Sequence, residues 1–323
     1  MKHFIITIDT EGDNLWEHRL ENTITTENAR YVPRFQNLCE KYNFKPVYLV
    51  NYEMAINDYF VDFAKNTLAN NSCEIGIHLH AWNNPPYYKL PKDSDNYGLP
   101  YLIEYPLATM RKKFALMYEL LKKRIDTEIT SHRSGRWAMN RDYFDILIEN
   151  KIKIDCSVTP HVSWMNTKGL SPGSKGPDYS KCSEKPFKIK HSLKEGSLTE
   201  VPVSIRMSRH FSVDATKLLH PRYALSTITN IINGKPLWLR PNGNNLSDML
   251  TLINCVKNSD SDYLMFMLHS SELMPSGSPK FRTIQSIETL YDHLEIIFNV
   301  ISKDFQGITL RDYFNRYITN GER

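Results

Sequence analysis

The sequence predicts an α/β protein in which a mainly parallel sheet is covered by helices. Short apolar runs typical of buried strands alternate with helical patterns along most of the 323 residues, as they do in a barrel or a doubly wound sheet. Seven or eight such units in a chain of this length favour a (β/α) barrel over the doubly wound alternative. We expect one catalytic domain over residues 1–323, because the alternation resumes after each long loop.

The expected elements follow from the apolar periodicity of each segment. Strands are predicted at 4–9, 46–51, 74–78, 128–132, 153–157, 199–203, 237–240, 263–269 and 307–310. Helices are predicted near 27–42, 57–70, 107–125, 140–150, 214–233, 245–257 and 283–302.

Two long irregular segments, at about 81–106 and 159–187, interrupt the alternation. Loops of this length are usually binding loops or linkers. Both are rich in Tyr, Trp and Pro, so we expect ordered loops that wall a site. The aromatic side chains of these loops could stack on sugar rings: Trp82, Tyr87, Tyr88 and Trp164.

Charge and cysteine content limit the classes of function. With 40 basic and 36 acidic residues, a net charge of +4 gives no support for a nucleic-acid partner. The five cysteines are scattered without a Cys-x-x-Cys pair, which suits a reduced, cytoplasmic protein. No apolar run approaches the roughly 18 residues of a membrane span, and no signal peptide is visible.

Polar side chains stand at the ends of one predicted strand after another. They are Asp9, Glu11, His78, His80, Arg133, Asp155, Arg240 and His269. The carboxyl ends of parallel strands meet at one edge of the sheet, where α/β enzymes place their active sites. A single histidine there is more often a hydrogen-bonded structural residue, but repetition over six strand ends favours a site.

The segment "EIGIHLHAW" (74–82) carries the strongest local signal. In a regular strand His78 and His80 point to the same face. Two imidazoles and one carboxylate form a site with open positions that suits Zn²⁺ or a similar divalent ion. Glu11 is the expected acidic ligand and Asp13 the less favoured one, a turn residue being its alternative role.

Three further segments supply polar residues for the same edge. "SHRSGRW" (131–137) provides Arg133, and a buried arginine can clamp a carboxylate and hold it ionised. Asp155 and His269 each end a predicted strand, and an acid and a histidine facing each other suit a general base and a general acid. The candidate substrate contacts are Trp82, Arg136, Trp137, Arg240 and Glu272.

Five motifs, in order from Asp9 to His269, resemble those of the NodB-type polysaccharide deacetylases (carbohydrate esterase family 4). "TIDTEGD" resembles the opening T-F-D-D motif, "EIGIHLHAW" the metal-histidine motif and "HRSGRW" the arginine motif. "DCSVT" and "LHSSEL" are similar to the two closing motifs. The pattern is most similar to a divergent branch found among capsule and O-antigen biosynthesis proteins.

The resemblance implies a distorted (β/α)7, TIM-like barrel that binds one divalent metal ion, usually zinc, and hydrolyses an acetyl group from a sugar. It implies that Asp9 is the general base and His269 the general acid. It assigns Arg133 to orienting Asp9, with Asp155 on the opposite side of that charge network. His78 takes the role of the first metal histidine.

The sequence departs from the family pattern at two positions. Family members have H-x-x-x-H, but the fifth position here is Trp82, so the second histidine ligand has to be His80. The second acid, Glu11, stands two residues after Asp9 instead of one. The substitution at Trp82 motivates an alternative hypothesis, a catalytically inactive sugar-binding barrel.

The leading hypothesis is a metal-dependent hydrolase that removes an N-acyl group, acetyl foremost, from an amino sugar in surface polysaccharide biosynthesis. The substrate would be nucleotide-, lipid- or glycan-linked. A deformylase or another amide hydrolase on the same scaffold is a further alternative. A serine hydrolase that uses Ser270 or Ser271 is disfavoured, because no G-x-S-x-G segment is present.

Overall fold

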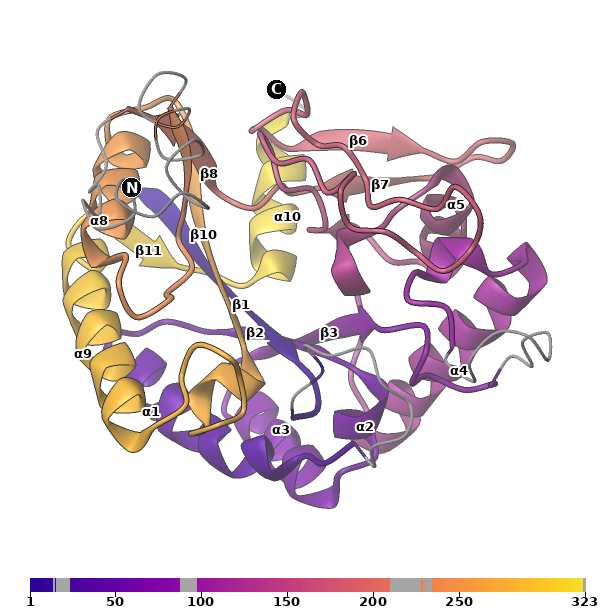
Figure 1. Cartoon of the computed structure of the whole chain (residues 1–323), viewed down its shortest axis with the longest axis horizontal. Coiled ribbons are helices and arrows are strands. Elements are labelled where there is room, and N and C mark those ends of the chain that lie inside the picture. Colours follow the sequence, from indigo (N-terminus) through magenta and orange to yellow (C-terminus); the bar gives the residue numbers. More distant parts are fainter. Residues whose placement is uncertain are drawn as a thin grey trace.

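Strand β1 (Lys2–Thr10) pairs in parallel with three other strands in a computed structural model of the chain (Figure 1). The structure describes residues 1–13, 15, 24–87, 98–209, 228, 230 and 234–321, with side chains as far as residue 316. The predicted helix near 214–233 lies outside the described residues, apart from 228 and 230, and so does Tyr88.

The large sheet has nine strands in the order β10, β1, β2, β3, β4, β5, β7, β6, and β11 also pairs with β1. Their bounds are β2 (Val47–Val50), β3 (Glu74–Leu79), β4 (Ser131–Ser134), β5 (Ile154–Asp155), β6 (Phe187–Lys190), β7 (Ser197–Glu200), β10 (Tyr263–His269) and β11 (Phe305–Gly307). Every pair is parallel except β6 with β7. Strands β8 (Ile205–Ser208) and β9 (Lys235–Trp238) form a separate antiparallel pair.

The predicted α/β fold with a mainly parallel sheet is therefore confirmed. The sheet is curled into a half-barrel (Figure 1). Its strand order ends at β10 and β6, and no pairing among the strands of the described ranges joins these two ends. The closed seven-stranded barrel stays a prediction.

Helices α8, α9, α1, α3, α4 and α5 lie in an arc along the convex side of the curled sheet in Figure 1, whereas α10 lies inside the arc and packs into the second core through Leu310 and Tyr313. The α-helices are α1 (Val32–Lys41), α2 (Tyr52–Ala55), α3 (Asp58–Ala69), α4 (Leu107–Ile125), α5 (Arg141–Glu149), α8 (Leu246–Lys257), α9 (Ile284–Ile301) and α10 (Leu310–Gly321). Short 3-10 helices are η1 (Glu27–Tyr31), η2 (Leu102–Glu104), η3 (Gly135–Trp137) and η4 (Ser270–Leu273). Among the described helices, none has the length and apolar character to cross a membrane.

Most predicted elements are present, and α4 and β10 coincide with their predicted ranges. The strand predicted at 153–157 is only two residues long, because the chain after β5 hydrogen-bonds through Asp155 and Ser157 side chains. Strands β6 and β8 and helices α2 and α10 were not predicted. Residues 159–186 contain no helix or strand, only two isolated bridges.

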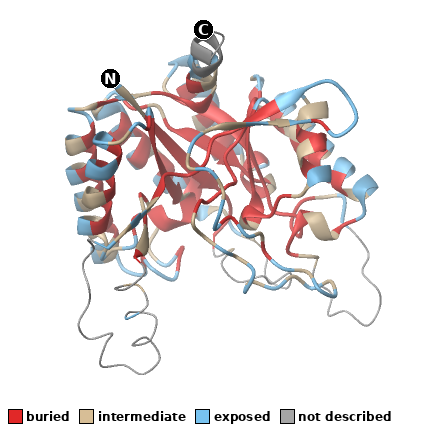
Figure 2. Ribbon diagram, turned by 90° about the horizontal axis from the view of Figure 1, so that it is seen from above, coloured by how far each residue is buried: buried red, intermediate tan, exposed pale blue. Residues whose placement is uncertain are grey.

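Alternation along the central strands separates two groups of side chains. On β1, Phe4, Ile6 and Ile8 pack into the large hydrophobic core, whereas Ile5 belongs to a second core within the curl of the sheet. Ile75 and Ile77 of β3 also belong to the large core. Figure 2 shows the strands buried and the exposed residues gathered on outer helix surfaces and loops. The parity that buries the isoleucines against the helices therefore sends Thr7, Asp9, His78 and His80 to the other face.

Candidate active site

A cavity of about 170 Å³ opens where β1, β3 and β10 end. It is lined by Asp9, Glu11, Leu15, His78, His80, Trp82, Ser134, Arg136, Trp137 and His269. Register explains the gathering, because Asp9 on β1 lies directly opposite His269 on β10, and His78 on β3 lies opposite Arg133 on β4.

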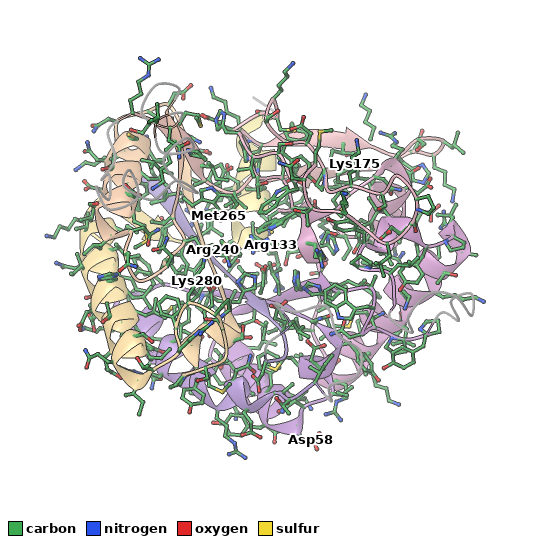
Figure 3. All side chains as sticks on the ribbon, in the orientation of Figure 1. Asp58, Arg133, Lys175, Arg240, Met265 and Lys280 are labelled. Atoms are coloured by element: carbon green, nitrogen blue, oxygen red, sulfur yellow. The ribbon has the colours of Figure 1, made fainter. Side chains whose placement is uncertain are left out.

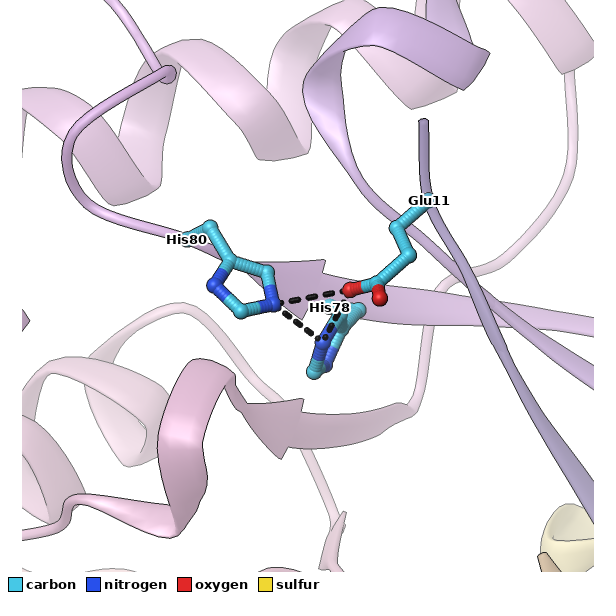
Figure 4. Close-up of side chains that lie close together, drawn as sticks. All are labelled: Glu11, His78 and His80. Atoms are coloured by element: carbon cyan, nitrogen blue, oxygen red, sulfur yellow. Dashed lines mark hydrogen bonds and ion pairs between the residues drawn. The ribbon is translucent and has the colours of Figure 1, made fainter. Parts of the chain in front are cut away.

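Glu11, His78 and His80 point their polar atoms at one another (Figure 4). Glu11 Oε2 lies 2.8 Å from His80 Nε2 and 3.4 Å from His78 Nε2, and the two Nε2 atoms are 3.0 Å apart. All three side chains are buried. The three ligand-type atoms lie within 4.8 Å of one another, close enough to share one small cation.

The surroundings of these atoms fit a divalent metal ion. His78 Nδ1 lies 3.0 Å from the main-chain oxygen of Arg133, which accepts the ring N–H and so leaves the Nε2 lone pair facing Glu11 and His80. Burial alone would raise the pKa of Glu11, but His80 and His269 outweigh it and hold that pKa well below its ordinary value. Two imidazoles and an ionised carboxylate, converging in a buried place, match the donor set that zinc and similar ions take in catalytic sites.

Asp9 is clamped by Arg133. Arg133 Nη1 donates to Asp9 Oδ1 at 2.5 Å, and both groups are buried. Burial would raise the pKa of Asp9, but the Arg133 guanidinium, with His78 and His269, lowers it below its ordinary value. Asp9 is therefore an ionised carboxylate whose second oxygen, Oδ2, lies 3.9 Å from His78 Nε2 and 3.7 Å from His269 Nε2.

His269 is held from behind by a buried acid. Glu272 Oε2 accepts the main-chain N–H of His269 at 3.0 Å and lies 3.0 Å from its Nδ1. Arg240 Nη2 lies 3.2 Å from the same Nδ1 and 3.7 Å from Glu272 Oε1. Although burial would raise the pKa of Glu272, Arg240 and His269 lower it to about 2. An ionised Glu272 beside Nδ1 leaves Nε2 of the His269 ring facing Asp9. Figure 3 shows Arg240 and Arg133 near the centre of the molecule.

Two of the predicted site acids lie outside this cavity. Asp155 is fully buried beside it, where its carboxylate contacts His132 Nδ1 at 2.7 Å and accepts the Ser157 hydroxyl at 2.8 Å. The Asp13 carboxylate accepts hydrogen bonds from the Thr25 hydroxyl and from the main-chain N–H groups of Glu27 and Asn28. Asp13 thus anchors the start of η1, and its oxygens serve that turn.

Of the five predicted substrate contacts, Trp82, Arg136 and Trp137 line the cavity, whereas Arg240 and Glu272 lie behind His269 and are not part of its lining. The Trp82 ring lies edge-to-face against His80 at 4.4 Å between centroids. Arg136 sits over the Tyr101 ring. Trp164, from the long loop, stacks on Trp137 at 6.3 Å between centroids, so an aromatic surface extends from the cavity.

Several residues that sequence reasoning missed hold the site together. Ser270 is fully buried, and its hydroxyl accepts the main-chain N–H of Glu11 and donates to the main-chain oxygen of Glu11, each at 3.0 Å. Asn28 Nδ2 donates to the same Glu11 oxygen at 2.7 Å. These contacts make Ser270 a support for Glu11, which is a different role from the nucleophile of the serine-hydrolase alternative. Asn51 directly follows β2, so the strand-end argument could have identified it, whereas no motif pointed to Glu53.

Comparisons with known proteins give the following findings. No family model matches this sequence, and neither does any curated protein. A polysaccharide deacetylase candidate from Mycobacterium smegmatis is similar in structure at 14% identity, covering 99% of this chain and 92% of that chain with a TM-score of 0.49. A 4-alpha-glucanotransferase from Thermococcus litoralis is similar over 97% of this chain and 38% of that chain, at 13% identity and a TM-score of 0.50.

A third similar structure is the family 4 acetyl xylan esterase from Clostridium thermocellum, solved with a cobalt ion. It is 15% identical, covering 97% of this chain and 91% of that chain with a TM-score of 0.40. At these identities the likeness concerns the fold. Solved structures that resemble this chain therefore include polysaccharide deacetylases and esterases of carbohydrate esterase family 4.

Proposed function

We propose that this chain is a metal-dependent amide hydrolase that removes an N-acyl group, acetyl foremost, from an amino sugar used in O-antigen or capsule biosynthesis. The observation that carries the proposal is the placing of Asp9 and His269 beside the Glu11, His78 and His80 centre. The five matching motifs support it, and the five free cysteines support a cytoplasmic setting.

Glu11, His78 and His80 would hold one divalent ion, with zinc as the first choice. When bound, such an ion polarises the acyl carbonyl and lowers the pKa of water. The donor set is one carboxylate and two imidazoles, which leaves coordination positions for water and substrate. Leu15, Trp82 and Trp137 line the cavity and would limit the water around the reacting group.

The ionised Asp9 accepts a proton from the water that attacks the acyl carbon. Arg133 keeps the carboxylate charged and fixes Oδ1, so Oδ2 is the oxygen that takes this proton. When the C–N bond breaks, His269 gives a proton from Nε2 to the departing nitrogen. Glu272 holds the ring by Nδ1 and its main-chain N–H, which keeps Nε2 on the side of Asp9.

The experiment that tests this function measures both metal and product. Purified protein is analysed for bound metal and then incubated with N-acetylated and N-formylated amino sugars, each offered nucleotide-linked, lipid-linked and as glycans. Release of acetate, abolished by a chelator and restored by Zn²⁺, is the expected result. Formate release in place of acetate would identify a deformylase, and sugar binding without bound metal or any release would identify the inactive sugar-binding protein.

A further inference from the structure

Glu53 is a buried carboxyl group next to the metal-ligand segments. It stands on α2, three residues after β2 ends, and its side chain accepts three hydrogen bonds. Glu53 Oε1 accepts the main-chain N–H of Gly12 at 2.6 Å and Asn51 Nδ2 at 3.2 Å, while Oε2 accepts Asn83 Nδ2 at 3.0 Å. Every partner is a donor here, so both carboxyl oxygens act as acceptors.

Asn51 connects this carboxyl group to both sides of the proposed centre. Its main-chain N–H donates to the Thr10 oxygen at 2.9 Å, at the end of β1. Its side-chain Oδ1 accepts the main-chain N–H of His80 at 3.2 Å, at the end of β3. Since its Nδ2 donates to Glu53, the amide ties the His80 main chain to the same carboxyl group that holds Gly12.

The Glu53 side chain also packs closely on the turn that carries Glu11. A Cβ at Gly12 would stand 3.0 Å from Glu53 Cγ and 2.3 Å from Ile24 Cγ2, so only glycine lets the chain approach this closely. Asn83 extends the contact to the segment that follows His80. Glu53 therefore contacts Gly12, which follows Glu11, and Asn51, which accepts the main-chain N–H of His80.

We infer that Glu53 is a positioning residue that sets the separation of Glu11 and His80, acting through Gly12 and Asn51. This inference rests on the proposed metal-dependent function. Burial raises the pKa of Glu53 to about 7, so its carboxyl group is costly to keep in this place. Partners behind metal ligands commonly change metal affinity or activity by roughly 10- to 100-fold when they are replaced.

A purely structural role would satisfy the same donors without affecting the metal. Glu74 provides the matched control, because it is a buried carboxyl at the opposite end of β3 that accepts the Ser131 hydroxyl at 2.7 Å and the Arg311 main-chain N–H at 2.8 Å. Burial raises its pKa as well. Replacing either acid by leucine leaves buried donors without acceptors, but only one of them lies beside Glu11 and His80.

The experiment measures Co²⁺ affinity, by competition with a chelator, and the Co²⁺ absorption spectrum, together with thermal stability. Glu53→Leu is expected to weaken Co²⁺ binding roughly 10- to 100-fold and to alter the spectrum. Glu74→Leu is expected to lower stability with an unchanged affinity and spectrum. The Co²⁺ affinity of Glu53→Gln should stay within about threefold of the wild-type value, because Oε1 of the new glutamine still accepts from Gly12 and Asn51. Asn83 Oδ1 has no hydrogen-bond partner among the described residues, so after a flip of the Asn83 amide it can accept from the glutamine Nε2.

The outcomes separate this inference from the function on which it rests. If Glu53→Leu keeps the Co²⁺ affinity and spectrum of the wild type, the positioning role is overturned and the proposed function stays intact. The same conclusion follows if Glu53→Leu and Glu74→Leu lose equal affinity for Co²⁺. Wild-type protein that binds no Co²⁺ would overturn both. If Glu53→Leu does not fold, Asn51→Ala is used in its place. It removes the side chain that links Glu53 to the His80 main chain, and it is expected to weaken Co²⁺ binding and alter the spectrum in the same way.

Discussion

Arg133 Nη1 donates to Asp9 Oδ1 over 2.5 Å, joining the ends of two strands that are 124 positions apart in the sequence. The other two nitrogens of Arg133 also donate, Nη2 to the Thr7 hydroxyl at 2.8 Å and Nε to the Cys156 main-chain oxygen at 3.1 Å. The guanidinium is thus fixed by both β1 and the segment after β5. It can hold Asp9 in one orientation and one charge state.

Arg133→Lys is expected to move the acidic limb of the pH profile of kcat/KM to higher pH. Arg133 is the strongest of the charges that lower the pKa of Asp9. A lysine ammonium cannot reproduce the separate contacts of the guanidinium with Asp9, Thr7 and Cys156, so the pKa of Asp9 rises and more alkaline pH is required to ionise it. We expect a shift on the order of one pH unit or more. Arg141→Lys, at an exposed position, is the control and should leave the limb in place. A limb that stays in place in Arg133→Lys as well would exclude Asp9 as the group that titrates.

Asp9→Asn and His269→Gln are each expected to lower kcat by roughly 10²- to 10⁴-fold, the usual contribution of a positioned acid or base. Neither residue belongs to the Glu11, His78 and His80 set, so both variants should fold and bind Co²⁺. Circular dichroism checks that the variants fold, metal content checks that they bind Co²⁺, and single-turnover rates measure the loss of activity. Asp178→Asn, an exposed acid in the 159–187 loop, is the control. Variants that keep the full rate would show that the proton transfers involve other groups.

Zn²⁺ is expected to stabilise the wild-type protein but not Glu11→Gln or His80→Ala. A ligand that binds only the folded state at a thousand times its Kd adds about 4 kcal/mol to the free energy of unfolding. Thermal melts of chelator-treated protein, with and without Zn²⁺, measure this gain. His161→Ala is a suitable control because that histidine, paired with Glu184, lies away from the cavity lining. An equal gain in all four proteins would place the bound metal elsewhere.

Gly135→Ala is expected to displace His80 and to weaken metal binding by about tenfold. A Cβ at Gly135 would stand 2.5 Å from the Leu79 main-chain oxygen and 2.9 Å from His80 Nδ1, so the end of β3 has to move. Gly173→Ala serves as the control, because a Cβ there meets nothing within 4 Å, although φ of +76° makes the change locally unfavourable. Chelator competition with Co²⁺ measures both variants. Wild-type affinity in Gly135→Ala would show that His80 is not a ligand.

Glu53 is expected to make the metal-free protein less stable as pH rises from about 4.5 to about 7. Burial raises the pKa of Glu53 from 4.5 to about 7, so the folded state binds a proton in this window that the unfolded state has lost. Its contribution, of about 3 kcal/mol, is complete below pH 4.5 and is lost as pH rises through 7. Urea unfolding of wild type and Glu53→Gln across this window measures it. Across this window the wild type should lose about 3 kcal/mol relative to Glu53→Gln, which has no such titration, and parallel curves would contradict the assignment.

Much of this site could be predicted because strands have a fixed period of two. That period places Asp9 on the same face as Thr7, and His78 on the same face as His80, wherever the neighbouring isoleucines are buried against helices. The parallel sheet then brings the strand ends to one edge. These inferences need only local pattern and general rules of α/β architecture.

The roles of Glu11 and Asp13 could not be separated in this way, because both follow the end of β1, where the regular period stops. Asp13 turns to the donors at the start of η1, and Glu11 turns to His80. Asp155 likewise ends a strand, but the neighbouring His132 takes its carboxylate into a separate buried cluster. Which donors stand nearby depends on segments distant in sequence, and no local pattern contains that information.

The sequence by itself determined the α/β class, the mainly parallel sheet and the gathering of acids and histidines at one edge, since these follow from periodicities of two and 3.6 residues. Only the tertiary structure decided that Ser270 supports Glu11 and that Glu53 connects Gly12 to Asn51. Each of these is a buried polar contact between distant segments. A buried polar group has to find its partner wherever packing places one, and that requirement is met in three dimensions.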